Sequence, residues 1–179
     1  MRYLTLIPVL FGLQALAENP QRIFPSLMVP LDERLGDKPL GTQKTADVEH
    51  AVHTEFSFDV AVNVASTCRL GFTMNADPAR GAPWKLWGEA PYVFNVSTLT
   101  QRPIWKHWDT WNNRQNYGPY VASFSVDQAG NVNVTDGEVE CAQGQATQYV
   151  LYPGSERDFG IMWFELKDPL HGLTYDLYE

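Results

Sequence analysis

Residues 55–63 read EFSFDVAVN, and this stretch decides the fold class. Apolar side chains occupy every second position, while the positions between them, beginning with Glu55, are polar or small. A period of two residues is typical of a β-strand with one face in the core. We therefore expect a half-buried strand here, with four side chains on its inner face: Phe56, Phe58, Val60 and Val62.

The same alternation recurs along the chain, and helical periodicity is scarce. Residues 127–130 end in Gly130, which can adopt the left-handed conformation that a short hairpin loop needs. On the hairpin strand that follows, Val132 and Val134 are expected to point inward. The further strands are expected near residues 24–29, 68–74, 92–97, 123–126, 131–135, 138–141, 148–152, 160–166 and 173–178.

Short strands separated by Gly, Pro, Asn and Asp favour an all-β fold, a single antiparallel β-sandwich, over a parallel sheet. Residues 23–179 are predicted to form this domain, and residues 18–22 a short lead. Residues 18–48 are Pro-rich and charged, which indicates an extended segment with one edge strand. Residues 75–91 and 101–120 are expected to be long loops that carry tryptophan.

Length and composition describe one globular domain. The chain has 179 residues, of which 44% are hydrophobic and 19% charged, enough for one core. Its net charge of -8 argues against a nucleic-acid-binding surface. No run of 18 apolar residues occurs, so no membrane span is expected.

The N-terminus resembles a secretory signal peptide. Residues 1–17 read MRYLTLIPVLFGLQALA, in which Arg2 precedes an apolar stretch and Ala15-Leu16-Ala17 is a small-x-small cleavage site. The alternative is an N-terminal core helix, which Pro8 and Gly12 disfavour. We expect cleavage after Ala17 and a secreted, extracellular product.

Two further features of the sequence can be interpreted if the chain is secreted. Cys68 and Cys141 are the two cysteines, and an even pair in an oxidising compartment predicts one disulfide. Both fall on the inward parity of their strands, as a bridge between two sheets would require. The sequons at Asn95 and Asn133 fall on outward parity and are predicted N-glycosylation sites.

Several short motifs occur in a familiar order. They are Phe24-Pro25-x-x-x-Val29-Pro30, Phe56-x-Phe58-Asp59-Val60, Cys68-x-Leu70-x-Phe72, Cys141-x-x-Gly144 and Asp168-Pro169-x-x-Gly172-Leu173. In this order they resemble the But-two (But2) C-terminal domain, found in secreted or surface fungal proteins and named after a ubiquitin-three-binding protein. The resemblance implies a β-sandwich with paired cysteines and no assigned catalytic residue. A secreted chain would not meet a cytosolic ubiquitin-like pathway, so we do not expect ubiquitin-related binding.

Residues 101–120, QRPIWKHWDTWNNRQNYGPY, form the most distinctive stretch, longer and richer in Trp around Trp105–Trp111 than is usual for that family. Aromatic rings flanked by amides and charges suit sugars, which stack on rings and hydrogen-bond beside them. The alternative is that several of these rings pack the loop onto the sandwich. The candidate ligand-binding residues are Trp105, Trp108, Trp111 and Arg114, with Trp84 and Trp87 as a possible extension.

Catalytic candidates are weak. Glycoside hydrolysis needs two acids across a cleft, and the available pairs are Glu138 with Glu140 and Glu165 with Asp168. Acids on an outer strand face are mostly solvated, and no nucleophile motif is present. We therefore predict no catalytic residue, and keep a glycoside hydrolase as the third alternative.

Metal and cofactor sites are not expected either. Residues 127–138 have the span of a calcium loop, but Ala129 and Val132 replace a ligand and the required glycine. His50 and His53 run into a strand and should lie on opposite faces. The sequence as a whole predicts a secreted binding protein for a polysaccharide or glycoprotein. The alternative is a structural or effector-type protein that binds another protein, and the oligomeric state stays open.

Overall fold

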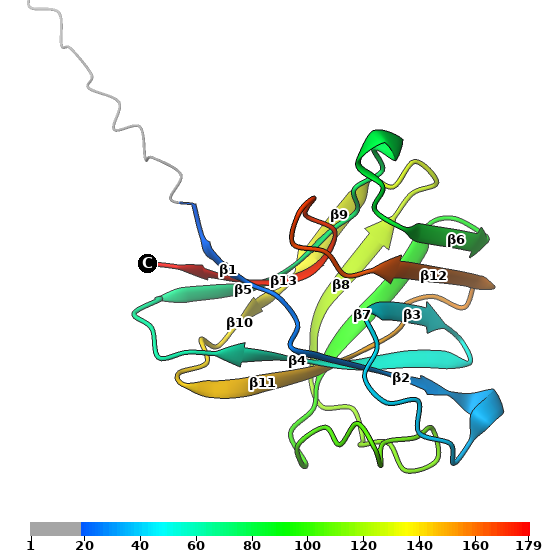
Figure 1. The fold of residues 1–179 in the computed structure, drawn as a ribbon, viewed down its shortest axis with the longest axis horizontal. Coiled ribbons are helices and arrows are strands. Elements are labelled where there is room, and N and C mark those ends of the chain that lie inside the picture. Colours follow the sequence, from blue (N-terminus) through cyan, green and yellow to red (C-terminus); the bar gives the residue numbers. More distant parts are fainter. Residues whose placement is uncertain (1–18) are drawn as a thin grey trace, which may run out of the picture.

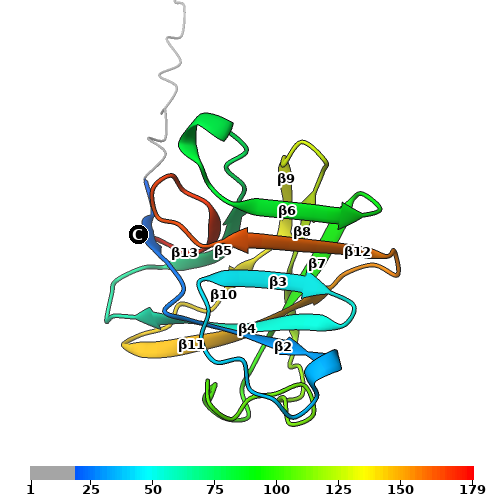
Figure 2. The ribbon, with the colours of Figure 1, turned by 45° about the vertical axis from the view of Figure 1, so that its right-hand side comes forward.

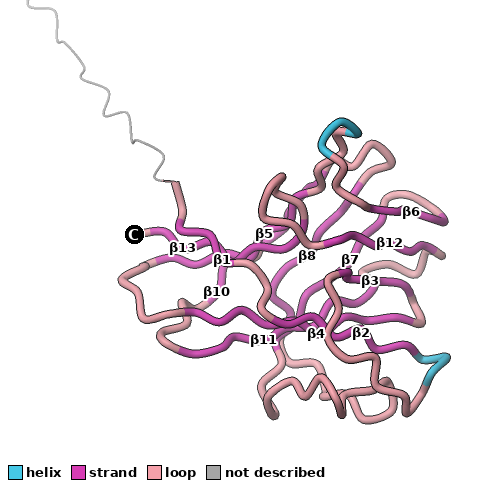
Figure 3. The backbone as a smooth tube through the Cα atoms, viewed as in Figure 1, coloured by secondary structure: helices cyan, strands magenta, loops and turns pink. Residues whose placement is uncertain are grey.

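The computed structural model describes residues 19–179, which form two antiparallel sheets packed face to face (Figures 1 and 2). The predicted signal peptide and its cleavage after Ala17 lie outside the described residues. Helix is confined to two single turns, η1 (Glu33–Leu35) and η2 (Pro78–Arg80), among the described residues (Figure 3). The all-β sandwich expected from the sequence is confirmed.

The smaller sheet has four strands in the order β1-β13-β5-β10, and the larger has nine in the order β6-β12-β3-β4-β11-β7-β8-β9, with β2 paired to β4. The small-sheet strands are β1 (Gln21–Ile23), β5 (Thr67–Thr73), β10 (Glu138–Val139) and β13 (Gly172–Tyr178). The large-sheet strands are β2 (Leu27–Asp32), β3 (Thr45–Glu49), β4 (Val52–Val60), β6 (Trp84–Gly88), β7 (Tyr92–Thr98), β8 (Tyr120–Val126), β9 (Val132–Asp136), β11 (Gln145–Pro153) and β12 (Phe159–Phe164).

The main core lies between the two sheets and is rich in aromatic rings. Phe56 and Phe58 are fully buried, as the alternation on β4 predicts. Trp163 is also fully buried, with its ring centroid 4.7 Å from that of Phe72 and 5.7 Å from that of Phe94. Aromatic pairs at such separations stabilise a core beyond the burial of their area.

One inner-face prediction is wrong, and the residue of another is less buried than expected. β4 stops at Val60, and Val62 in the following loop is 82% exposed, because the chain there turns toward the small sheet. Val134 pairs in register with the core residue Phe124 and so lies on the inner face as predicted, but it is 41% exposed because β9 is the outermost strand of its sheet. Val132 does pack against the core.

The Cys68–Cys141 disulfide is confirmed, but its position corrects the expectation of a bridge between sheets. Cys68 lies on β5 and pairs in register with Val139 of β10, so Cys141 follows the neighbouring strand of the same small sheet. β10 is only two residues long. The bond therefore holds the short edge strand to β5, and closing its loop stabilises the fold by about 4 kcal/mol in the chain-entropy model.

Two segments expected to be loop or extended chain contain strands. β6 occupies part of residues 75–91 and pairs with β12, and β3 pairs with the other side of β12. Trp84 and Trp87 therefore stand on an edge strand, not in a loop. The expected edge strand at residues 24–29 overlaps only β2, from Leu27 to Val29, in the large sheet; β1 lies before it and joins the small sheet.

The hairpin of β8 and β9 is confirmed. Gly130 has a φ of 83°, in the left-handed region. The Asp127 carboxylate accepts hydrogen bonds from the backbone N–H groups of Ala129 and Asn131, each at 2.9 Å. These bonds shape the turn, so the hairpin itself explains the presence of Asp127 at this position.

Candidate ligand-binding surface

The segment between β7 and β8, which we call the tryptophan loop (residues 99–119), covers the outer face of the large sheet. It forms the lower end of the molecule in Figures 1 and 2. Beneath it lies a second small core, separate from the one between the sheets. Its buried members are Val29, Leu31, Leu99, Ile104 and Val150.

Trp111 belongs to this second core. Its ring is partly buried there, with the His53 ring centroid 4.8 Å away and the Arg114 guanidinium 4.1 Å from its centroid. Arg114 also donates a hydrogen bond to the Trp111 carbonyl oxygen. Trp111 thus follows the packing alternative and is not a free platform, while Arg114 is held in place by it.

Trp105 and Trp108, in contrast, face solvent, with 52% and 62% of their surfaces exposed. A tight turn connects them, in which the N–H groups of Trp108 and Asp109 donate to the Trp105 carbonyl oxygen at 2.7 and 2.8 Å. Lys106 and His107 between them are exposed as well. Two indole rings and two basic side chains therefore share one projecting turn.

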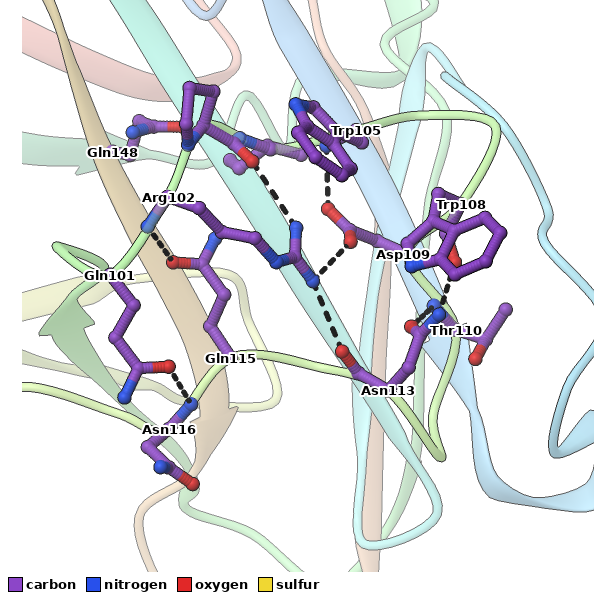
Figure 4. Close-up of polar contacts among 12 residues, drawn as sticks. Gln101, Arg102, Trp105, Trp108, Asp109, Thr110, Asn113, Gln115, Asn116 and Gln148 are labelled. Carbon is purple, nitrogen blue, oxygen red and sulfur yellow. Dashed lines mark hydrogen bonds and ion pairs between the residues drawn. The ribbon is translucent and has the colours of Figure 1, made fainter.

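A buried ion pair supports this turn from below (Figure 4). Asp109 is fully buried, and one of its carboxylate oxygens lies 2.6 Å from Arg102 Nη2. The other oxygen accepts the Trp105 backbone N–H at 2.6 Å. Arg102 also donates to the carbonyl oxygens of Pro103 and Asn113, at 3.2 and 3.0 Å. The Arg102 guanidinium thus bonds the chain both before and after the turn.

Amide side chains hold the rest of the loop backbone (Figure 4). Asn113 accepts from Thr110 N–H at 2.8 Å and donates to the Trp108 carbonyl oxygen at 2.7 Å. Gln148, on β11, accepts from Ile104 N–H at 2.6 Å, which ties the loop to the sheet. The loop has no regular secondary structure, so these side chains take the place of a hydrogen-bonded ladder. Gln115 and Gln101 act in the same way, accepting from Arg102 N–H and Asn116 N–H.

Glu55 is a buried acid beneath the loop that the sequence did not single out. It lies on the outer face of β4, between Val29 and Val150 of the two neighbouring strands. It is fully buried, and neither carboxyl oxygen has a hydrogen-bond partner. Burial, together with the nearby Asp109 carboxylate, raises the pKa of Glu55 to about 8. Alternation placed Glu55 outward, but only strand pairing reveals its apolar neighbours.

His53 lies near the start of β4, two residues before Glu55, in an aromatic cluster. Its Nδ1 shares a hydrogen bond with the Tyr117 hydroxyl, and its ring also packs against Tyr152. Burial, with a smaller effect of Arg114, lowers the pKa of His53 to about 4. His50, in the turn before β4, interacts with the Arg157 carbonyl oxygen at 2.8 Å. Within residues 19–179, no three His, Cys, Asp or Glu residues gather as metal ligands would.

Trp84 and Trp87 do not extend this surface. Trp84 packs against the core between the sheets. The Trp87 ring lies on the opposite face of β6 and covers Gly160 of the neighbouring strand β12. β6 lies at the opposite end of the molecule from the tryptophan loop (Figure 1). Of the six candidate ligand residues, the structure pairs Trp105 with Trp108 on the exposed turn and Trp111 with Arg114 at the second core, all within the tryptophan loop.

Three of the four acids considered for hydrolysis have other contacts: Glu138, Glu165 and Asp168. Glu138 is exposed and lies 3.6 Å from Arg69. Glu165 accepts from Trp163 Nε1 and Leu173 N–H, each at 3.1 Å, and its burial raises its pKa to about 7. Asp168 pairs with Arg80 at 2.9 Å. Glu165 and Asp168 thus bind different groups.

The two sequons differ in accessibility. Asn133 is exposed on the edge strand β9. Asn95 is half-buried on β7, on the face away from the main core, and its side chain lies against Gly154. Both asparagines therefore have the outward orientation that their alternation predicts, and Asn133 has the more open surroundings.

The chain is similar to one family of known proteins. In residues 19–179 no helix is long or apolar enough to cross a membrane. None of the curated proteins compared with the chain matches it. A family model described as the ubiquitin 3 binding protein But2 C-terminal domain matches residues 23–169, which include the disulfide and the whole tryptophan loop. Because this match covers most of the sandwich, the chain belongs to the But2 C-terminal domain family.

Proposed function

We propose that the chain is a secreted, non-catalytic binding protein whose tryptophan loop holds an extracellular polysaccharide. The observation that carries this proposal is the exposure of Trp105 and Trp108, at 52% and 62%, on a turn anchored by a buried ion pair. Indole faces stack on the C–H faces of sugar rings. A turn that is already ordered loses little conformational entropy when a ligand binds.

The non-catalytic character is supported by the surroundings of the acids. Glycoside hydrolysis requires two carboxyl groups that face the substrate across a cleft. Glu55 and Asp109 lie beneath the loop but are fully buried, so a polymer on the loop would not touch them. Their role is to support the loop.

Sedimentation with insoluble chitin, β-glucan and cellulose tests the proposal, with soluble sugar measured in the supernatant. We expect the mature protein to be retained by at least one polymer without sugar release. The double variant Trp105→Ala, Trp108→Ala should lose retention, while its thermal unfolding stays close to wild type because both rings are exposed.

Trp87→Ala is the matched control, since it removes an indole at the opposite end of the molecule. It should leave retention unchanged. Release of soluble sugar by the wild type would contradict the non-catalytic assignment. Retention that is insensitive to Trp105 and Trp108 would contradict the assignment of the surface.

A protein partner is the second candidate, and the family description favours it because it names a ubiquitin 3 binding protein. Exposed Trp side chains are enriched among the residues that dominate protein interfaces. The same double variant distinguishes the two candidates. Binding of a purified ubiquitin-fold domain that depends on Trp105 and Trp108, without retention on any polymer, would replace the polysaccharide with a protein.

A further inference from the structure

We infer that the ligand of the tryptophan loop is an anionic polysaccharide, whose sugar carboxylates pair with Arg114 and Lys106. This inference rests on the proposed function and adds the charge of the ligand to it. It starts from a local excess of positive charge in a protein whose net charge is -8.

The charges on the loop do not cancel. Residues 101–120 contain three basic residues, Arg102, Lys106 and Arg114, and one acid, Asp109. Asp109 is fully buried against Arg102 at 2.6 Å, so these two charges neutralise each other inside the loop. Lys106 and Arg114 remain, and no ion pair within residues 19–179 involves either of them.

Arg114 is held in a defined position. Its guanidinium lies 4.1 Å from the centroid of the Trp111 ring and donates to the Trp111 carbonyl oxygen. Trp111 is itself anchored in the second core. A free surface arginine would lose side-chain entropy on binding an anion, whereas a stacked one has already lost most of it. The planar fork of a guanidinium matches the two oxygens of a carboxylate.

A polar hollow of about 580 Å³ lies at this arginine, and its other lining residues are Asn112, Gln115, Asn116 and Tyr117. Asn112 and Asn116 are exposed, and their amide groups are suitable partners for sugar hydroxyls, whereas Gln115 is buried and the Tyr117 hydroxyl bonds His53. Asn113 lies between the lining residues Asn112 and Arg114 in the chain, and it donates to the Trp108 carbonyl oxygen at 2.7 Å (Figure 4). This bond links the hollow to the turn that carries the exposed rings. One acid contacts its rim, Asp37, which accepts from Asn112 Nδ2 at 3.0 Å.

These features describe two adjacent subsites on one loop. The Trp105–Trp108 turn offers stacking faces and Lys106, while the Arg114 hollow offers a fixed cation among amides. A neutral polymer would use the first subsite and leave the second cation unpaired. A polymer with a carboxylate on its sugars would use both.

The test compares polygalacturonate with its fully methyl-esterified form, which keeps the sugar backbone but removes the charge. We expect the wild type to bind polygalacturonate about tenfold more tightly, the size of one hydrogen bond to a charged group. Added salt should reduce this preference. Arg114→Gln should abolish most of it, Lys106→Gln should reduce it, and Arg114→Lys should retain part of it.

Arg80→Gln is the matched control, because Arg80 lies in η2 at the other end of the molecule. Thermal unfolding of each variant checks that the fold is intact. Equal binding of both polymers that still depends on Trp105 and Trp108 would overturn the anionic ligand and leave the proposed function standing. Binding of neither polymer would overturn the anionic ligand, and it would overturn the proposed function as well only if chitin, β-glucan and cellulose also fail to retain the protein. Binding that does not depend on Trp105 and Trp108 would overturn both. A preference that persists in Arg114→Gln would overturn the assignment to this arginine.

Discussion

Glu55 of β4 and Asp109 of the tryptophan loop are both fully buried, with the Arg102 guanidinium 2.6 Å from Asp109 as the neutralising cation. Burial disfavours the charged form of Glu55, and the Asp109 carboxylate nearby adds to this effect, so the pKa of Glu55 rises to about 8. At neutral pH Glu55 is therefore protonated. The charge state under the loop is therefore part of its support.

This relationship predicts a dependence of stability on pH. The pKa of Glu55 is about 8 in the folded protein, against an ordinary value of 4.5, so the folded state binds the extra proton. Its contribution to the free energy of unfolding is complete below about pH 4.5 and is lost as pH rises through 8, by a few kcal/mol at most. Denaturant unfolding at pH 5, 7 and 8.5 measures this loss.

Glu55→Gln provides the control, since it keeps the shape and cannot ionise. The variant should show a shallower fall in stability between pH 5 and 8.5 and should exceed the wild type at the upper end. Asp47 and Glu165, whose pKa values burial raises to about 6 and 7, remain in both proteins. Parallel pH profiles in the two proteins would show that Glu55 is not the responsible group.

Removing the buried acid of the loop should be costly. In Asp109→Ala, Arg102 loses its partner and the Trp105 N–H loses its acceptor. Breaking such a buried pair typically lowers the free energy of unfolding by about 3 kcal/mol. Denaturant unfolding gives this value, and limited proteolysis within residues 99–119 should become faster. Asp109→Asn, which keeps an acceptor oxygen for Trp105, should cost less; equal losses would refute the acceptor role.

The three tryptophans of the loop should separate into two classes. Trp111 packs in the second core, so Trp111→Ala should lower the free energy of unfolding by about 2–3 kcal/mol. Trp108 is 62% exposed, and Trp108→Ala should change it by about 0.5 kcal/mol or less. Thermal and denaturant unfolding of the two variants measure the difference. A large loss in Trp108→Ala would mean that its ring packs the loop instead of facing a ligand.

Gly160 and Trp87 should be energetically coupled. A Cβ atom at Gly160 would lie 2.0 Å from Cε2 of the Trp87 ring, so Gly160→Ala forces this ring off the strand. Overpacking of this kind typically costs about 1–3 kcal/mol. In the Trp87→Ala background the same change should cost clearly less, which a double-mutant cycle of unfolding free energies detects. Additive effects would contradict the contact.

Local patterns in the sequence predicted much of the fold because they report on local geometry. The alternation on β4 identified Phe56 and Phe58 as core residues, and Gly130 marked the hairpin. β3 and β6 were missed because they lie in segments read as extended chain or loop, and their strand character becomes visible only in their pairing with β12. The location of the disulfide in one sheet depended on strand order, which alternation does not contain.

The candidate site was predicted in outline and corrected in detail. The spacing of Trp105, Trp108 and Trp111 marked the loop, but a segment without regular structure has no period from which to read direction. The turn after Trp105 exposes two of the rings, and the second core takes the third. Trp84 and Trp87 were separated from the loop by their place on β6.

By itself, the sequence determined the class of this protein: alternating strands, paired cysteines and glycine turns specify an antiparallel sandwich, since each depends on residues close in the chain or on chemistry. Only the tertiary structure decided which groups meet beneath and upon the loop. Glu55 becomes a buried acid because Val29 and Val150 flank it and Asp109 lies near it, although the four are distant in sequence. Burial and charge neutralisation are properties of such assembled neighbours, so no local pattern could reveal them.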